Sequence, residues 1–599
     1  MCRAIDRHVY VDAAEGDDPA MMAWRGYQPS LSGNNEMVRD LNGGTVKEPR
    51  PQPLAELIQS SAPASSTVMS WLHRVRVSHD VGLSASRNGG ATLLPSPATG
   101  VAAALVLAAV LTALVPLVGP HGAGLTPDSA TYGAAARSLS QGHGYLDLDG
   151  ISPMLDFPPT YPALLALGLL GGLSVASAGA IVGLGCAVAL GWVMLAWARR
   201  LGLGHVASTI VALVVALLPP IVESSTATLS EPPFILLTSA VGLTLTALFS
   251  QPWRRRRVLV LVGLLQVACL TRYLGVALVA GVALVVALHG DAPLRRRLVR
   301  AVVVAAAGVA PLGLWFVRNT LVSGHPTADD YGATRSTVVS HLSDDLIGIG
   351  GWFVGQAAAT GTTIMVAVAL LSVPLGWVVV RARRSANPAV GAVSVVFGSY
   401  FALVLLGQSL IGLDTDDRFM RPLAPALVAL SACALAALTQ RRRLTGSLVA
   451  VVLLIIVGTT AGQALVQQRG EAPSGLADYN AAHWQHSALL ATLRQSPARN
   501  IIVSNDSYAV SLLTGQRVEQ SPATVYDNST QTTGDLDQFV NDVRDAPRTL
   551  VWFDHPDVGQ LQPLSNLSRR VCLRQIAHLA DGLMLETCGS RPGQQMPTG

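Results

Sequence analysis

The stretch "VLVLVGLLQVACLTRYLGVALVAGVALVVALHG", residues 258–290, is almost entirely apolar, with Arg272 and Tyr273 near its centre. Arginine clusters flank it on both sides, at 254–257 and at 295–297. Such clusters beside membrane spans mark the cytoplasmic side, and a single crossing would put the two clusters on opposite sides. The stretch therefore predicts a hairpin of two helices that turns at "TRY", with Arg272 and Tyr273 at the outer surface.

The composition of the whole chain agrees with a membrane location. Its 599 residues are 50% hydrophobic and only 13% charged, which excludes an ordinary soluble protein of this length. The net charge of +4 is small, and the basic residues form short clusters between apolar runs. We interpret these clusters as orientation signals and not as a nucleic-acid-binding surface.

Apolar runs that can cross about 30 Å of hydrocarbon need roughly 20 residues. The basic clusters between them fall on one side, which predicts the cytoplasmic face. The run 158–174, "PPTYPALLALGLLGGLS", is short and would invert this arrangement, so we expect it to be interfacial or re-entrant. About eleven spans are predicted, near 100–119, 176–197, 203–222, 228–249, 257–271, 274–289, 299–317, 353–380, 389–412, 420–439 and 445–467.

The chain divides by composition into three parts. Residues 1–95 are polar and lack an apolar period, which predicts a disordered cytoplasmic segment. Residues 96–469 hold the predicted spans, and residues 470–599 mix short β-type runs with a helical pattern. The predicted fold class is mainly α: a polytopic transmembrane helical bundle with a small C-terminal extracytoplasmic α/β domain.

Cys572 and Cys588 are predicted to form a disulfide, because both lie in the part expected outside the cytoplasm. They are symmetric about Ala580, so a hairpin with a three-residue loop 579–581 would place them opposite each other. A two-residue turn at Asp581 and Gly582 would shift them out of register.

Charged and polar residues gather at the predicted outer ends of several spans. Because a charge within a bilayer costs about 2.5–3.5 kcal/mol on insertion scales, we expect such residues to converge on one wet cavity. The alternative is that each only marks a water interface. The residues are Asp128, Asp147, Asp149, Asp156, Arg272, Arg318, Asn319, His325, Asp329, Asp330, Asp414, Asp416, Asp417 and Arg418.

Six sequence pieces occur in an order that resembles the C superfamily of glycosyltransferases (GT-C), in the branch with aminoarabinose and protein-mannose transferases. The resemblance covers roughly 100–470 and the C-terminal tail. The pieces are "TPDSATYGAAARSLSQGHGY" from 126, "LDFPPTYP" from 155, "LSEPPFILL" from 229, "LTRYLG" from 270, "WFVRNTLVSGHPT" from 315 and "DDRFMRPLAPAL" from 416.

The resemblance implies an inverting transferase that passes a sugar from a polyprenyl-phosphate donor to an envelope glycan, glycolipid or protein acceptor. It implies a multi-pass protein of the bacterial inner membrane that acts at its outer face, with the N-terminus in the cytoplasm. The expected partners are the lipid-linked donor, the acceptor and the bilayer. A polytopic transporter or flippase, or a non-catalytic binder of lipid-linked sugars, are the alternative functions.

Asp128 is implied as the base that takes the acceptor proton. The alternative is a helix N-cap, since "PDSATYGAAARSL" also describes a helix start. Asp156 matches a second acid that supports the base or binds a metal, although the lysine often found next to that acid is missing. Its alternative is an ordinary loop acid before Pro158.

Arg272, Arg318 and Arg418 are expected to bind the donor phosphate, with Tyr273 and His325 as further substrate-binding residues. The alternative is snorkelling, or pairing with the nearby acids of 414–417. For Glu231, a helix start with two prolines is the favoured interpretation. No residue is assigned as a metal ligand, but a divalent metal held by His143 and His325 with Asp128 or Asp156 stays an alternative.

Overall fold

The computed structural model describes most of the chain beyond residue 96. The predicted disordered segment 1–95, and most of the predicted span 445–467, lie outside the described residues. The described ranges are 97–118, 122–250, 253–289, 292–327, 338–355, 360–382, 388–411, 417–439, 478–523, 534–556 and 561–588, with a few residues between 458 and 466.

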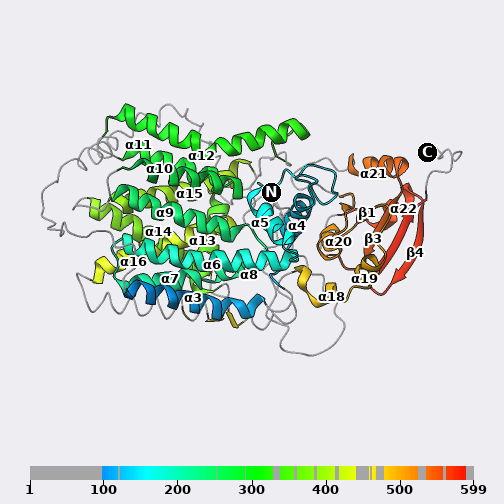
Figure 1. The fold of residues 1–599 in the computed structure, drawn as a ribbon, viewed down its shortest axis with the longest axis horizontal. Coiled ribbons are helices and arrows are strands. Elements are labelled where there is room, and N and C mark those ends of the chain that lie inside the picture. Colours follow the sequence, from blue (N-terminus) through cyan, green and yellow to red (C-terminus); the bar gives the residue numbers. More distant parts are fainter. Residues whose placement is uncertain are drawn as a thin grey trace, which may run out of the picture. The chain divides into compact units, whose positions relative to one another are not determined.

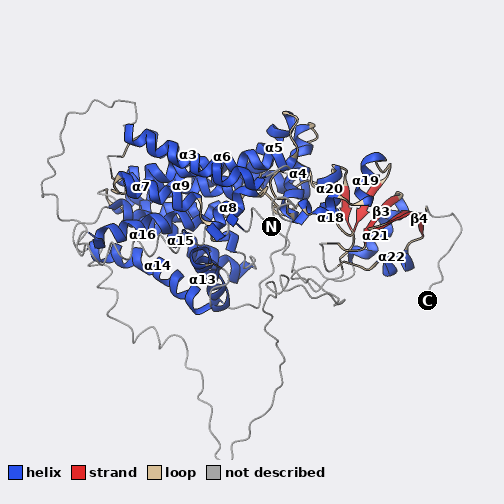
Figure 2. Ribbon diagram, turned by 90° about the horizontal axis from the view of Figure 1, so that it is seen from below, coloured by secondary structure: helices blue, strands red, loops and turns tan. Residues whose placement is uncertain are grey.

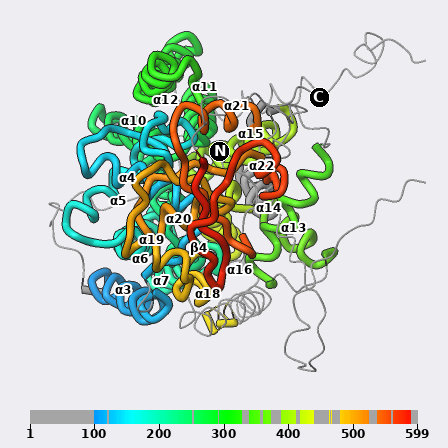
Figure 3. The backbone as a smooth tube through the Cα atoms, turned by 90° about the vertical axis from the view of Figure 1, so that its right-hand side faces the viewer, coloured from blue at the N-terminus to red at the C-terminus, as the bar shows by residue number. Residues whose placement is uncertain are grey.

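The first part of the described chain is a bundle of helices (Figure 1). The strands of the described chain all lie in its C-terminal part (Figure 2). α3 and α12 lie at opposite edges of the bundle (Figures 1 and 3). The bundle contains α3 Pro97–Val118, α6 Val175–Arg200, α7 His205–Ala216, α8 Pro219–Thr226, α9 Glu231–Phe249, α10 Arg255–Thr271, α11 Gly275–Leu288, α12 Leu294–Ser323, α13 Val338–Val354, α14 Thr360–Ala382, α15 Pro388–Ile411 and α16 Ala424–Thr439.

Within the described ranges, six helices are long and apolar enough to cross a membrane, or seven if one bent pair counts as a single span. The chain is thus a multi-pass membrane protein, but the predicted count of about eleven spans is not confirmed. One reason is length. The 17 residues of α10 and the 14 of α11 rise only about 25 and 21 Å at about 1.5 Å per residue.

The predicted hairpin at "TRY" is confirmed. Thr271 ends α10 and Gly275 begins α11, with Arg272 between them in an extended conformation. A Cβ at Gly275 would lie 2.6 Å from the backbone nitrogen of Cys269, so only glycine lets the two helices approach this closely.

Two predicted spans have different boundaries in the structure. The predicted span 203–222 is not one straight helix, because α7 and α8 meet at an angle of 53° just before Pro219 and Pro220. Proline removes a backbone donor and clashes with the preceding turn, which ends α7. The span 353–380 also begins too early, since its first residues end the separate helix α13, which the sequence did not predict.

The segment between α3 and α6 carries two short helices, α4 Pro127–Ser140 and α5 Thr160–Leu170. With 11 residues, α5 is too short to cross a membrane, in agreement with the expected interfacial or re-entrant segment. Its Leu167 and Leu170 are about two-thirds exposed, which suits contact with lipid.

The C-terminal part is an α/β domain around one five-stranded sheet, as predicted. The strand order is β2-β1-β3-β5-β4, with β2, β1 and β3 parallel and the other pairs antiparallel. Its elements are α18 Ala482–Gln485, α19 Ala488–Gln495, β1 Ile501–Ser504, α20 Ser507–Thr514, β2 Val518–Gln520, α21 Gly534–Asp545, β3 Arg548–Phe553, α22 Leu564–Arg570, β4 Leu573–Leu579 and β5 Gly582–Thr587.

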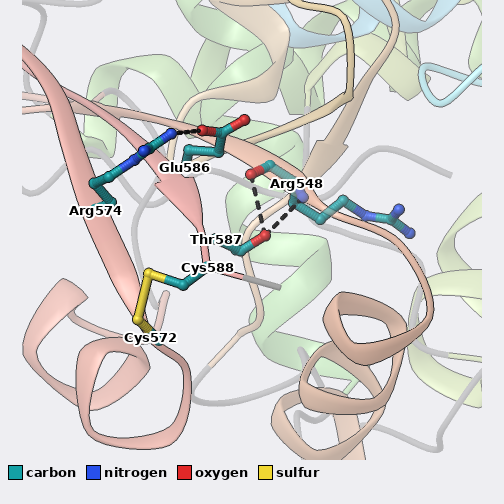
Figure 4. Close-up of a disulfide and its surroundings, with 6 residues drawn as sticks. All are labelled: Arg548, Cys572, Arg574, Glu586, Thr587 and Cys588. Carbon is teal, nitrogen blue, oxygen red and sulfur yellow. Dashed lines mark hydrogen bonds and ion pairs between the residues drawn. A yellow bond between two sulfur atoms is a disulfide. The ribbon is translucent and has the colours of Figure 1, made fainter. Parts of the chain in front are cut away.

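The predicted disulfide between Cys572 and Cys588 is confirmed (Figure 4), but the predicted three-residue loop is wrong. Leu579 pairs with Gly582, which leaves a two-residue turn. A β-bulge between Gln575 and Ala577 then shifts the register of β4 by one residue. The bulge cancels the offset of the shorter turn, so the two cysteines face each other.

The α/β domain shares a hydrophobic core with α4 and α5. Tyr132 and Tyr161 of these helices belong to the same buried cluster as Trp484 and Val510. Arg137 of α4 donates from Nη2 to the Ser511 carbonyl oxygen at 2.7 Å. Further backbone bonds join the two parts, including Tyr479 N–H to the carbonyl of Leu125. The position of α4 therefore depends on the C-terminal domain.

Candidate active site

Four charged side chains from distant segments converge at one end of the bundle. Asp128 is near the start of α4, Glu231 begins α9, Arg272 follows α10, and Arg418 lies in the 3-10 helix Asp417–Phe419. We call these four residues the carboxylate–arginine network. It brings together three of the predicted site residues, Asp128, Arg272 and Arg418, and adds Glu231.

Arg418 connects the two carboxylates of the network. Its Nη2 lies 2.7 Å from Asp128 Oδ2 and 2.6 Å from Glu231 Oε1. Arg272 Nη1 lies 2.6 Å from the same Glu231 oxygen. Glu231 is 1% exposed and Asp128 is 6% exposed, so these pairs are removed from bulk water and weakly screened.

The N-cap of α4 is Thr126 and not Asp128. Ser129 Oγ accepts a hydrogen bond from the Thr126 N–H at 2.9 Å, while Asp128 is the second residue of the helix. The interpretation of Asp128 as a helix cap is therefore wrong. Its carboxylate is directed to Arg418.

Glu231 is the residue that the sequence interpretation undervalued. It does begin a helix next to Ser230, but its side chain pairs with both arginines. Its Oε2 is buried without a hydrogen-bond partner among the described residues. A usable signal existed, because an acid at the start of an apolar span requires a cationic partner.

Of the acids near Arg418 in sequence, the structure describes Asp417. It accepts from Trp352 Nε1 at 2.9 Å and from Arg421 Nη2 at 3.1 Å. Asp414 and Asp416 lie outside the described residues. Arg421 also pairs with Glu223, an interaction that the sequence did not predict.

A second group of residues surrounds Asp156. The Tyr273 hydroxyl donates to the carbonyl of Leu155 at 2.8 Å, and the Tyr145 hydroxyl donates to the carbonyl of Phe157 at 2.9 Å. Burial raises the pKa of Tyr273 to about 12, and the negative charge of Asp156 contributes to this rise. Burial also raises the pKa of Tyr145, again with a contribution from Asp156. Both hydroxyls therefore stay protonated donors at neutral pH.

Arg318 lies at the end of α12, 5.0 Å above the ring of Trp315. Its Nη1 donates to Asn319 Oδ1 at 3.0 Å. Among the ion pairs of the described residues, none joins Arg318 to a carboxylate, in contrast to Arg272 and Arg418. Its charge acts on the hydroxyl of Tyr273, which places it near the Asp156 group.

His325 is exposed, and its ring takes part in no hydrogen bond recorded for the described ranges. His143 is also exposed. In the described part of the chain, no three His, Cys, Asp or Glu residues lie close enough together to hold a metal ion. The contacts thus do not bring either histidine to Asp128 or Asp156.

Comparison with known proteins shows the fold. No protein-family model matches the sequence, and no curated protein matches it significantly. The structure of ArnT from Cupriavidus metallidurans in the apo state matches with a TM-score of 0.56 and 16% identity, over 82% of this chain and 98% of that one. The structure of ArnT from the same organism bound to undecaprenyl phosphate matches with a TM-score of 0.54 and 15% identity, over 82% of this chain and 97% of that one.

A structure of the Archaeoglobus fulgidus oligosaccharyltransferase with zinc and sulfate matches with a TM-score of 0.49 and 11% identity, over 76% of this chain and 67% of that one. The likeness to ArnT covers nearly all of the ArnT chain. The chain therefore shares the fold of ArnT, in agreement with the fold that the sequence resemblance implies.

Proposed function

We propose that this chain is a membrane glycosyltransferase that moves a sugar from a polyprenyl-phosphate donor to an acceptor hydroxyl, with inversion. The observation that carries the proposal is the carboxylate–arginine network, which holds the buried Asp128 beside two guanidinium groups. The likeness to ArnT, whose complex with undecaprenyl phosphate has the same fold, supports the choice of donor.

In the proposed reaction, Asp128 takes the proton of the acceptor hydroxyl as its oxygen attacks the anomeric carbon. The bond between that carbon and the phosphate oxygen breaks, and polyprenyl phosphate leaves with the bonding electrons. Arg418 orients the Asp128 carboxylate, because its guanidinium lies 2.7 Å away.

Arg318 is the arginine that we assign to the first contact with the donor phosphate, because no carboxylate of the described residues neutralises it. A guanidinium binds phosphate through a planar pair of donors. Arg272 and Arg418 share Glu231 and supply the two positive charges of the network. They are suited to stabilise the charge that develops on the leaving phosphate.

Glu231 Oε2 is a further candidate contact, for a sugar hydroxyl. It is a buried carboxylate oxygen that lacks a hydrogen-bond partner within the described ranges. A hydroxyl donor would satisfy it. Asp156, in the segment between α4 and α5, is proposed to support Asp128 as the base.

The acceptor is proposed to be an envelope glycan, glycolipid or protein at the outer face of a bacterial inner membrane. This orientation places residues 1–95 in the cytoplasm and 470–599 outside, with 96–469 as the membrane part. It rests on the arginine clusters at 254–257 and 295–297.

Deletion of the gene, followed by analysis of envelope glycolipids, polysaccharides and glycoproteins, tests the function. One sugar is expected to disappear from an envelope product and to return with the wild-type protein but not with Asp128→Asn. The same sugar should be transferred by purified protein in lipid vesicles that contain the lipid-linked donor. Accumulation of donor on the cytoplasmic face, with no transfer by purified protein, would instead indicate a flippase.

A further inference from the structure

The peptide segment around Asp156 is held from both sides by tyrosine hydroxyls. Tyr273 donates to the carbonyl of Leu155, the residue before Asp156, at 2.8 Å. Tyr145 donates to the carbonyl of Phe157, the residue after it, at 2.9 Å, and to that of Pro158 at 3.2 Å. Tyr145 lies 11 residues before Asp156 along the chain, whereas Tyr273 comes from the α10–α11 hairpin.

Both tyrosines have the same support. Trp315 of α12 contacts the ring of Tyr145, with ring centroids 5.2 Å apart. The next residue, Phe316, contacts the ring of Tyr273, with centroids 5.4 Å apart. One turn of α12 therefore fixes the two rings, and their hydroxyls fix the peptide groups on either side of Asp156.

This arrangement leaves Asp156 little freedom. Two flanking carbonyls are bonded, and Pro158 and Pro159 restrict the backbone that follows. The two hydroxyl protons are already used on protein carbonyls. Tyr273 is consequently better suited to orient Asp156 than to donate to a substrate, the role expected from the sequence.

We propose that Tyr145 and Tyr273 are positioning residues that hold the Asp156 carboxylate in its working orientation, a role that rests on the proposed transferase function. Loss of the Tyr273 hydroxyl frees the carbonyl of Leu155, and loss of the Tyr145 hydroxyl frees those of Phe157 and Pro158; in each case the other tyrosine still holds its side of the segment. Loss of both releases the segment and moves Asp156. Such a displacement lowers the rate of the chemical step while donor binding stays almost unchanged.

The kinetic test uses full-length protein in lipid vesicles. We expect Tyr145→Phe or Tyr273→Phe to lower kcat by about 5-fold, as the loss of one neutral hydrogen bond suggests. The double variant should lower kcat by more than the product of the two single-variant factors, while KM stays within about 2-fold of wild type. In an Asp156→Asn background, the same double substitution should have no further effect on kcat, because it acts through Asp156. An equal loss in both backgrounds would overturn the proposal.

A second measurement does not require activity. Hydrogen exchange of residues 153–157 should become faster in the double variant, and exchange of α4 should not change. Ser568→Ala, which removes an exposed hydroxyl bonded to the carbonyl of Ser565 in α22, is the control and should leave both kinetics and exchange unaltered. Unchanged exchange of 153–157 in the double variant would also overturn the proposal. If the wild-type protein transfers no sugar but the exchange changes as expected, the proposed transferase function is wrong, whereas the role of the two tyrosines in holding the segment around Asp156 is supported.

Discussion

Arg418 donates from Nη2 to Asp128 Oδ2 at 2.7 Å, although 290 residues separate the two in sequence. This contact joins α4, the first helix after α3, to the segment just before α16. It places the proposed base beside a cation. Because the two side chains pair across the fold, their roles cannot be inferred from the local helix pattern. The first prediction follows from it.

Asp128→Asn is expected to lower transfer by about 10²–10⁴-fold, the usual contribution of a general base, without loss of folded protein. Asp128→Ala should lower transfer as much and should leave the Thr126–Ser129 cap of α4 intact, but it also removes a buried partner of Arg418 and so lowers stability. Transfer of labelled sugar by purified variants measures the effect. Asp149→Asn, in the exposed loop, is the control, and normal transfer by Asp128→Asn would refute the assignment.

Glu231→Gln is expected to destabilise the protein by about 3–5 kcal/mol, since it breaks buried ion pairs and leaves Arg272 and Arg418 less compensated. Thermal unfolding in detergent measures the loss. Glu223→Gln is a matched control, because the Glu223 side chain is 57% exposed and pairs with Arg421 at 3.2 Å. It should cost at most about 1 kcal/mol. Equal losses for the two variants would argue against a structural importance of the network.

Arg318→Ala is expected to weaken binding of polyprenyl phosphate by about 10–100-fold, from the loss of charge-assisted hydrogen bonds. Arg318→Lys should retain part of the affinity. The protein should fold normally, because Arg318 has no carboxylate partner within the described part of the chain. Equilibrium binding to the lipid in nanodiscs gives the result, with the exposed Arg574→Ala as control. An unchanged Kd would exclude Arg318 from the phosphate site.

Replacement of Cys572 and Cys588 by serine is expected to destabilise the α/β domain by about 3 kcal/mol, the value for a closed loop of about 15 residues. The sequence separation of the two cysteines is 16. Chemical unfolding followed by tryptophan fluorescence reports the change. Alkylation before and after reduction should differ by two thiols, and identical counts would show that the bond does not form in the cell.

Cysteines placed at Ile151 and Ser568 are expected to react with a membrane-impermeant reagent from outside, and a cysteine at Arg255 only after permeabilisation. All three positions are exposed, so the result depends on the side of the membrane and not on burial. The native cysteines are first replaced. Labelling of position 255 in intact cells would reverse the proposed orientation.

Much of the helical fold could be predicted from apolar length and arginine clusters, which are local properties. The α10–α11 hairpin was found in this way. The bend between α7 and α8 was missed because the apolar run continues through Pro219, and only the proline geometry separates the helices. The register of β4 was also beyond prediction, since the bulge near Ile576 has no marker in the sequence.

The site was predictable in part. Asp128, Arg272 and Arg418 were selected because charged residues at the outer ends of spans are expensive unless they meet. Glu231 was set aside because "SEPP" describes a complete helix start. Its place at the start of an apolar span indicates that a cationic partner is needed, but nothing local identifies Arg418, 187 residues away. The cap of α4 was left open for a related reason: Asp128 or Ser129 can open a helix by sequence alone, and the bonds between Thr126 and Ser129 are needed to identify the cap.

The core that α4 shares with the C-terminal domain also sets an order of assembly. Ser511 is made 374 residues after Arg137, which at about 5–20 residues per second is a delay of roughly 20–75 s on the ribosome. During this time α4 lacks the partner that buries Tyr132. In the proposed orientation, we therefore expect the base to reach its final position only after the last domain has crossed the membrane and folded, and we expect truncated or stalled chains to be inactive.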